Sequence, residues 1–311
     1  MPHSALLRRI LPWIAAIAIV GYVLRVVSIE EAWSALLRAR LDLILPLVFG
    51  TVLGWFLIDS RAYAYAFSRF NTPVSWPEAR SLRGVTYLLT PIHLSLGKAA
   101  LVLRLHTVKN VSLLEGTSSV ALYQTIDAVV LASLTALGLG LIPTTPETSA
   151  ARTGAIAVVL VVMSYLLLLR SDRPNFRLLD RLRRLTLHHS HRQIRIRDVS
   201  VLVCAKLAYH LVSIIAFYFG TQAFGIDVPF VLVLAVTPMI EAIGGLPITP
   251  GGLGTQQAAM LYFFGNYGSE AAIVAFGFSL PIAFMVVRSL IGLAYLPALT
   301  PNAELESLPI R

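Results

Sequence analysis

The sequence predicts an all-α polytopic membrane protein with six spanning helices and two re-entrant helical hairpins, arranged as an inverted-topology repeat. Composition is the first observation behind this prediction, because 57% of the 311 residues are hydrophobic and only 13% are charged. Soluble proteins average roughly 45–50% apolar and about 25% charged residues. A soluble fold of this length cannot bury so much apolar surface, which excludes a soluble enzyme, a disordered chain and a secreted scaffold.

Uninterrupted apolar segments are the second observation. A helix needs about 20 mostly apolar residues to cross a bilayer. The segments of suitable length are 10–27, 41–66, 118–142, 154–169, 199–224 and 271–296. The first follows Arg8 and Arg9, and no convincing small-residue cleavage site comes after it, so we expect a retained anchor rather than a signal peptide.

Two further apolar segments are interrupted, and these are the third observation. Residues 82–103 contain Pro91 near the middle and Gly97 soon after. Proline in a helix interior removes one hydrogen bond and clashes with the preceding turn. We therefore predict a re-entrant hairpin of two half-helices that opens to the cytoplasm.

The second interrupted segment covers residues 229–264. Its centre, 244–254, has two prolines and five glycines in eleven residues, which no continuous helix tolerates. Thr249 suits a helix N-cap and Pro250 the first helical position, so a half-helix starting here could hold an anionic headgroup with its free N–H groups and positive dipole end. The alternative is that the cluster only turns the chain inside the protein.

A basic loop fixes the expected orientation. Residues 170–198 contain nine arginines, and positively charged loops stay in the cytoplasm. Counting segments from this loop places both termini in the cytoplasm and the 143–151 and 225–228 loops outside. Binding of anionic lipid by the basic loop is a secondary expectation.

The order of segments is the same in both halves but starts on opposite sides of the membrane. We therefore expect one transmembrane domain, 1–311, made of a first inverted repeat over 1–142 and a second over 150–300. A weak sequence echo supports the repeat: Thr90-Pro91 comes before Gly97, and Thr249-Pro250 comes before Gly254. Interrupted segments at matching positions of two repeats point to a transporter's binding site.

Charged residues inside predicted helices are costly in lipid and usually functional. Lys98, Lys206 and Arg288 all fall on the cytoplasmic side of the midplane in this topology, where together they could attract a lipid phosphate. Asp127 and Glu241 could neutralise them. The alternatives are snorkelling of the cations to the interface, and structural ion pairs or protonated carboxyl groups for the two acids.

Three other charged or titratable residues receive structural interpretations. His210 lies one helical turn after Lys206, and we expect a satisfied interior histidine. Asp59 and Arg61 are assigned to the membrane interface and its aromatic belt. The predicted substrate-binding residues are therefore Lys98, Asp127, Lys206, Glu241, Thr249, Gly251, Gly252, Gly254, Gln256 and Arg288.

Residues 246–259, LPITPGGLGTQQAA, resemble the signature of a flippase-like integral membrane family that includes the transmembrane portion of lysylphosphatidylglycerol synthase. The resemblance implies a multi-pass protein of the bacterial cytoplasmic (inner) membrane that moves a polar lipid between leaflets. The synthase's soluble transferase domain has no counterpart in the 311 residues, so we do not expect aminoacylation by this chain.

The chain also departs from the family pattern. Lys98 and Leu101 occupy places where relatives usually have an acidic residue and an arginine. Tyr123 and Gln124 stand where relatives tend to have Glu-Arg shortly before an aspartate, here Asp127. The lipid can therefore differ from the one best known for the family.

Transport or flipping of a polar or anionic lipid is the predicted function. Two alternatives stay open: a lipid-headgroup transferase that uses Asp127 or Glu241 as base, and a non-catalytic membrane partner of a lipid-synthesis complex. No phosphate-binding loop or metal-ligand spacing is present, so we expect no cofactor or metal. The expected partners are a phospholipid or other polar lipid, and a second copy of the chain or a lipid-synthesis enzyme, but not nucleic acid.

Overall fold

The computed structural model describes residues 29–89, 94–170, 189–245 and 254–299. Within these ranges the secondary structure is helical, without strands. The predicted anchor at 10–27 and the centres of both interrupted segments lie outside the described residues. The helical secondary structure of the described residues agrees with the predicted all-α class.

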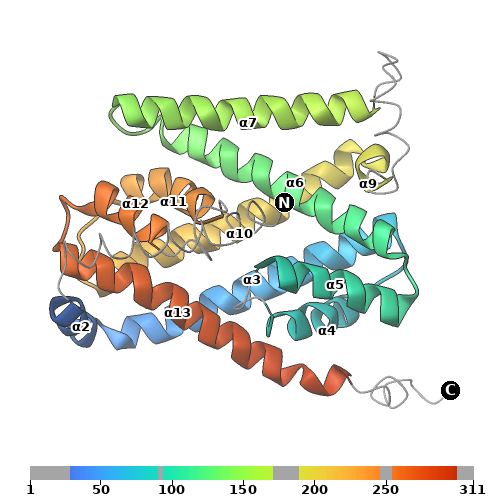
Figure 1. Ribbon diagram of the computed structural model, residues 1–311, viewed down its shortest axis with the longest axis horizontal. Coiled ribbons are helices and arrows are strands. Elements are labelled where there is room, and N and C mark those ends of the chain that lie inside the picture. Colours follow the sequence, from blue (N-terminus) through green and yellow to red (C-terminus); the bar gives the residue numbers. More distant parts are fainter. Residues whose placement is uncertain (1–28, 90–93, 171–188, 246–253, 300–311) are drawn as a thin grey trace, which may run out of the picture. The chain divides into compact units, whose positions relative to one another are not determined.

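Five described helices are long and apolar enough to cross a membrane (Figure 1). They are α3 (Leu41–Phe70), α6 (Leu113–Gly138), α7 (Pro146–Arg170), α10 (Ile196–Ala223) and α13 (Glu270–Ala294). Each matches one predicted span. Five of the six predicted spans are therefore confirmed as apolar helices of sufficient length, and the sixth falls on the undescribed 10–27 segment.

Helix α7 shows why the predicted bounds needed correction. The predicted span began at residue 154, whereas α7 begins at Pro146. Thr145 accepts a hydrogen bond from the Thr148 backbone N–H at 3.2 Å, and proline follows at the first helical position. Polar residues of the first two turns thus belong to the helix, and the predicted 143–151 loop is shorter than expected.

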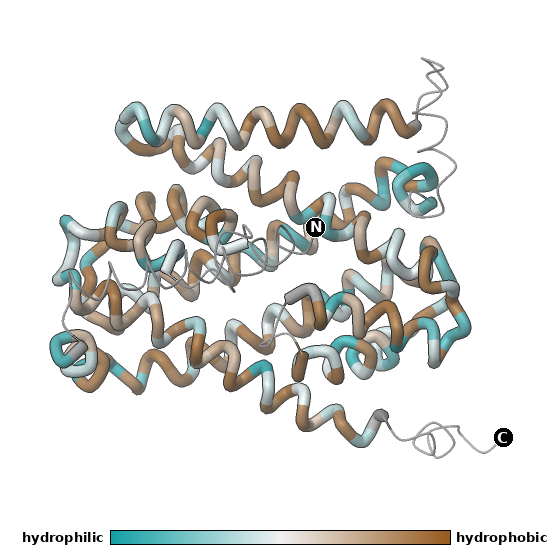
Figure 2. Tube along the Cα trace, in the orientation of Figure 1, coloured by the Kyte–Doolittle hydropathy of each residue, from teal (hydrophilic) through white to brown (hydrophobic). Residues whose placement is uncertain are grey.

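Apolar side chains remain exposed on these helices. Leu160, Val161 and Leu167 of α7 are more than half exposed, and Figure 2 shows hydrophobic residues through the middle of that helix. Large apolar surfaces of this kind mark contact with a partner or with lipid. The pattern is that of a multi-pass membrane protein.

Each interrupted segment contributes two separate described helices, on either side of residues that are not described. The first forms α4 (Trp76–Thr86) and α5 (Leu94–Lys109), and the second forms α11 (Phe230–Gly245) and α12 (Thr255–Phe264). The two helices of each pair contact each other. Each pair is therefore a helical hairpin, while re-entry into the membrane stays a prediction.

The basic loop is shorter than predicted because its end is structured. Residues 189–193 form the short helix α9 (His189–Gln193), and α10 already begins at Ile196. Ser190 of α9 is buried and donates its backbone N–H to Ser118 Oγ at 2.9 Å. Asp198 is also buried and accepts a hydrogen bond from Tyr65 at 2.6 Å. This end of the predicted loop is therefore structured and partly packed, while its arginines Arg192, Arg195 and Arg197 are exposed.

The chain divides into two compact units whose boundary falls within each of the five long helices. Unit 1 comprises residues 1–51, 131–156 and 210–284. Unit 2 comprises residues 52–130, 157–209 and 285–311. Unit 1 therefore contains the α11–α12 hairpin, and unit 2 contains the α4–α5 hairpin. Each unit draws on both predicted repeats, and the inverted repeat itself stays a prediction.

Candidate functional site: a buried cationic cluster in unit 2

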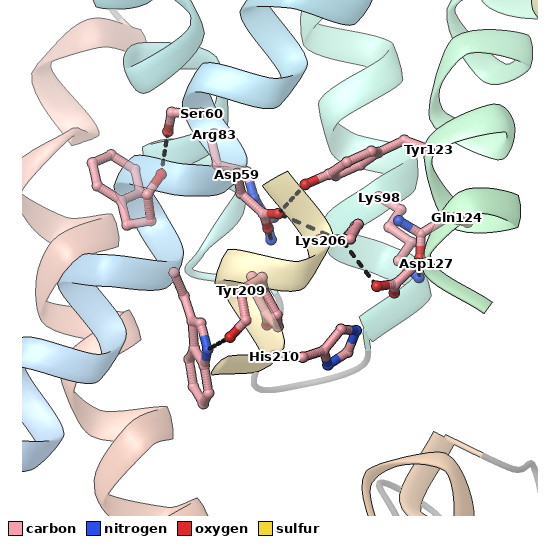
Figure 3. Close-up of polar contacts among 12 residues, drawn as sticks. Asp59, Ser60, Arg83, Lys98, Tyr123, Gln124, Asp127, Lys206, Tyr209 and His210 are labelled. Carbon is pink, nitrogen blue, oxygen red and sulfur yellow. Dashed lines mark hydrogen bonds and ion pairs between the residues drawn. The ribbon is translucent and has the colours of Figure 1, made fainter. Parts of the chain in front are cut away.

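Asp59, near the middle of α3, lies at the centre of a charged network in unit 2 (Figure 3). Only 4% of the residue is exposed. Arg83 Nη2 of α4 lies 3.0 Å from Asp59 Oδ2, and the Tyr123 hydroxyl of α6 donates to Oδ1 at 3.0 Å. A carboxylate withdrawn from water needs such partners, because burial penalises its charged form. Asp59 thereby ties α4 and α6 to α3.

Lys206 of α10 joins this network from the other side. Its ammonium lies 3.2 Å from Asp127 Oδ1 and 3.7 Å from Asp59 Oδ1. The ring centroids of Tyr123 and Tyr209 are 3.9 and 4.9 Å away, within cation–π range. Lys206 is 3% exposed. The alternative in which Lys206 snorkels to the interface is therefore wrong. The ion pair with Asp127 fits both the predicted neutralisation in a lipid site and the alternative of a purely structural ion pair.

Lys98 of α5 approaches the same face of α6. It donates a hydrogen bond to Gln124 Oε1, and Gln124 lies one helical turn before Asp127 (Figure 3). Among the described residues, no carboxylate lies within ion-pair distance of Lys98. Its bonded partner is thus a neutral amide.

Arg288 of α13 is held by aromatic rings. Its guanidinium carbon lies 4.8 Å from the Trp55 ring centroid and 5.9 Å from that of Tyr87. Trp55 is itself fixed, because it stacks on Tyr209 and donates its indole N–H to the Tyr209 carbonyl at 3.3 Å. The Arg288 Nε is buried and has no hydrogen-bond partner among the described residues.

Tyr87 connects Arg288 to the rest of the network. The Arg83 guanidinium lies 4.6 Å from the Tyr87 ring centroid, so two arginines share one ring. We call the six charged residues the cationic cluster: Asp59, Arg83, Lys98, Asp127, Lys206 and Arg288. The cluster holds four cations and two carboxylates, all within unit 2. Its net positive charge suits binding of an anion.

The structure separates the predicted substrate-binding residues into two groups. Unit 2 contains Lys98, Asp127, Lys206 and Arg288, which all belong to the cationic cluster. Unit 1 contains Glu241, Gly254 and Gln256. The remaining three, Thr249, Gly251 and Gly252, lie outside the described residues.

In unit 1, Glu241 of α11 pairs with a histidine. Its Oε2 lies 2.8 Å from His210 Nδ1 of α10. The expectation that His210 is a satisfied interior histidine is therefore confirmed. The expectation that Glu241 neutralises a lysine or arginine needs correction, because the partner that the structure gives Glu241 is His210.

The N-terminus of α12 lies at a glycine. The helix α12 begins at Thr255, and its N-cap is Gly254, whose φ of 87° favours glycine, while the predicted start at Thr249-Pro250 lies outside the described residues. The buried Gln257 accepts the Gly254 N–H at 2.7 Å and donates to the Gly277 carbonyl of α13 at 2.6 Å. Gln256 instead packs against α11, where a Cβ at Gly244 would lie 1.9 Å from Gln256 Nε2. Gln257 is thus a structural residue that the sequence prediction missed.

Asp59, Arg83 and Tyr87 were also missed. Asp59 was assigned with Arg61 to the interface, yet only Arg61 is exposed. The prediction ended this helix at residue 66, whereas α3 continues to Phe70, which places Asp59 further from the helix end. Arg83 gave a usable signal, since it is an arginine inside an apolar interrupted segment.

The fold and the cluster define a multi-pass helical membrane protein with a buried, positively charged polar site. The chain belongs to the lysylphosphatidylglycerol synthase TM region family, whose sequence profile matches residues 10–292. This confirms the resemblance carried by residues 246–259 and associates the chain with lipid handling. A search of curated proteins found no match.

Proposed function

We propose that the protein is a transporter or flippase that moves a polar or anionic lipid between the leaflets of a bacterial cytoplasmic membrane. The observation that carries this proposal is the excess of cations in the cluster. Lys98 donates a hydrogen bond to the neutral Gln124 amide and Arg288 lies over the Trp55 ring, whereas Arg83 and Lys206 have carboxylate partners. Both side chains are half-buried; a cation partly withdrawn from water without a counter-ion is costly, and an anionic ligand lowers that cost.

Each unpaired cation would contribute differently to headgroup binding. A guanidinium can donate two parallel hydrogen bonds to a phosphate, whereas an ammonium acts as a point charge. In our proposal Arg288, oriented by Trp55, binds the phosphate with two hydrogen bonds. Lys98, oriented by Gln124, neutralises the remaining negative charge of the phosphate. The acyl tails stay in lipid while the headgroup crosses.

Two further features support transport. The chain contains two helical hairpins at corresponding places in its segment order, as expected for a transporter built from inverted repeats. Unit 2, with the cationic cluster, also includes α9 and the start of α10, which form the described end of the basic segment that we assign to the cytoplasm, so we propose that the cluster serves the inner leaflet. Both termini are cytoplasmic in this topology, and a second copy of the chain or a lipid-synthesis enzyme is the proposed protein partner.

The proposal is tested by leaflet exchange of labelled phospholipids in proteoliposomes. Arg288→Ala should lose most of the exchange activity. Arg288→Lys should restore only part of it, because a lysine cannot donate two parallel hydrogen bonds to the phosphate. Arg61→Ala is the matched control, since Arg61 lies in the same unit but is exposed. Detergent gel filtration verifies folding. Exchange by Arg288→Ala at the parental rate across several anionic lipids would remove Arg288 from the site.

A lipid-headgroup transferase is the second candidate, and the His210–Glu241 pair favours it. Histidine hydrogen-bonded to a carboxylate is a common general-base arrangement. Mass spectrometry of lipids after incubation distinguishes the two functions, because a transferase changes the headgroup mass and a flippase does not. A changed mass in the parent that is lost in Glu241→Gln would favour group transfer. The non-catalytic partner role predicts neither exchange nor a changed mass.

A further inference from the structure

We propose that the cationic cluster selects phosphate headgroups of net negative charge over zwitterionic and cationic ones, and that Lys98 and Arg288 impose this selection. The inference rests on the proposed function, since it names the lipid class that the same site would accept. The proposed selection depends on a feature of this sequence, the lysine at position 98.

Two ion pairs lie within the cluster. Arg83 and Asp59 form one ion pair at 3.0 Å, and Lys206 and Asp127 form another at 3.2 Å. The charges of these four residues cancel. Two positive charges remain, on Lys98 and Arg288, and no described carboxylate lies within ion-pair distance of either.

The partners that the structure gives these two cations are neutral groups. The Gln124 amide oxygen orients Lys98, and the Trp55 ring orients Arg288, without cancelling either charge. The buried Arg288 Nε, which lacks a hydrogen-bond partner among the described residues, also calls for an acceptor, because buried donors are nearly always satisfied. Side chains that are held in place by neutral partners and keep their positive charge are typical of an anion-binding site.

Electrostatics then ranks the headgroups. An anionic phosphate compensates the two unpaired charges, and a zwitterionic headgroup brings an extra ammonium into the same low-dielectric region. A cationic headgroup adds a further like charge, which the site repels. The expected order of affinity is therefore anionic, then zwitterionic, then cationic.

Binding of lipids to the purified full-length chain tests the selection independently of transport. Native mass spectrometry would compare phosphatidylglycerol, phosphatidylethanolamine and lysylphosphatidylglycerol with identical acyl chains. We expect phosphatidylglycerol to be retained about tenfold more tightly than the lysyl lipid, the ratio that corresponds to about 1.4 kcal/mol. Equal retention of the anionic and cationic lipids would overturn the proposal.

Charge reversal sharpens the test. Lys98→Glu should shift the preference toward the lysyl lipid, while Arg61→Glu, an exposed reversal in the same unit, should leave the ranking unchanged. If Lys98→Glu does not fold, Lys98→Gln and Arg288→Gln replace it, and each should shrink the anionic preference. An unchanged ranking in the folded variants contradicts the proposal.

Two further arms separate this inference from the proposed function. Soluble glycerol 3-phosphate is added as a competitor, since the same phosphate chemistry can come from a free metabolite. Full displacement of the bound lipid at equal concentration would support phosphate selection but contradict a lipid substrate. Leaflet exchange is measured in parallel. An anionic ranking without exchange refutes the flippase and supports the selection, whereas exchange without a ranking refutes the selection alone.

Discussion

The two helical hairpins are stabilised by different chemistry. The α4–α5 hairpin carries Arg83 and Lys98, which contact Asp59 of α3 and Gln124 of α6. The α11–α12 hairpin is joined at Gly244 and Gln256, and Gln257 links it to the backbone of α13. The α4–α5 hairpin therefore contributes cations to the cationic cluster, whereas the α11–α12 hairpin combines the His210-paired Glu241 with close packing and neutral hydrogen bonds. We propose headgroup selection for Lys98 of the first hairpin together with Arg288 of α13.

Removing the carboxylate at the centre of the cationic cluster should have the largest effect on stability. Asp59→Ala leaves Arg83 without its counter-ion among the described residues and leaves Lys206 with Asp127 alone, a type of change that costs about 3–5 kcal/mol. Thermal unfolding in detergent should shift strongly downward.

The matched control for Asp59 is on the same helix. Asp42→Ala removes an exposed ion pair with Arg40, and exposed pairs contribute little. We expect no measurable shift for this variant. Similar melting curves for the two variants would show that the Asp59 pairs are not important for the fold.

The α12 end of the α11–α12 hairpin should depend on neutral hydrogen bonds made by Gln257. Gln257→Ala leaves the Gly254 N–H and the Gly277 carbonyl without their partner, at about 1–3 kcal/mol for a buried unsatisfied group. Gln256→Ala is the neighbouring control and removes packing at Gly244 only. Equal melting temperatures for the two variants would contradict the structural role of Gln257.

A smaller, pH-dependent effect is expected at the start of α4. Burial raises the pKa of Glu78, but hydrogen bonds from Lys109 and Ser75 outweigh it, so the pKa is lowered below the ordinary value. A lowered folded-state pKa means that Glu78 stabilises the fold above the unfolded-state pKa. This stabilisation is lost as the pH falls through the lower, folded-state pKa.

The measurement is the melting temperature of the parent and of Glu78→Gln over a pH series. The difference between them should be constant near neutral pH and shrink below about pH 4.5, the ordinary range of a glutamate. A difference that grows as the pH falls has the wrong sign and would exclude this account of Glu78.

The spanning helices could be predicted from the sequence because apolar length alone determines them. Bounds were less accurate where caps decide, as at Pro146 of α7. Four members of the cationic cluster were predicted because a charge inside an apolar segment is visible without a structure. Asp59 and Arg83 were not assigned to the site, because their pairing depends on how α3 and α4 pack, and no local pattern encodes that contact.

We propose that the unpaired cations of the cluster move a lipid headgroup. Leaflet exchange by a double variant tests this proposal most directly. Lys98→Gln/Arg288→Gln removes both unpaired charges, and Arg61→Gln/Arg152→Gln removes two exposed charges as a control of equal net charge. We predict that exchange of phosphatidylglycerol falls to the background of empty vesicles in the first variant and stays at the parental rate in the second. Parental exchange by folded Lys98→Gln/Arg288→Gln would contradict the proposal.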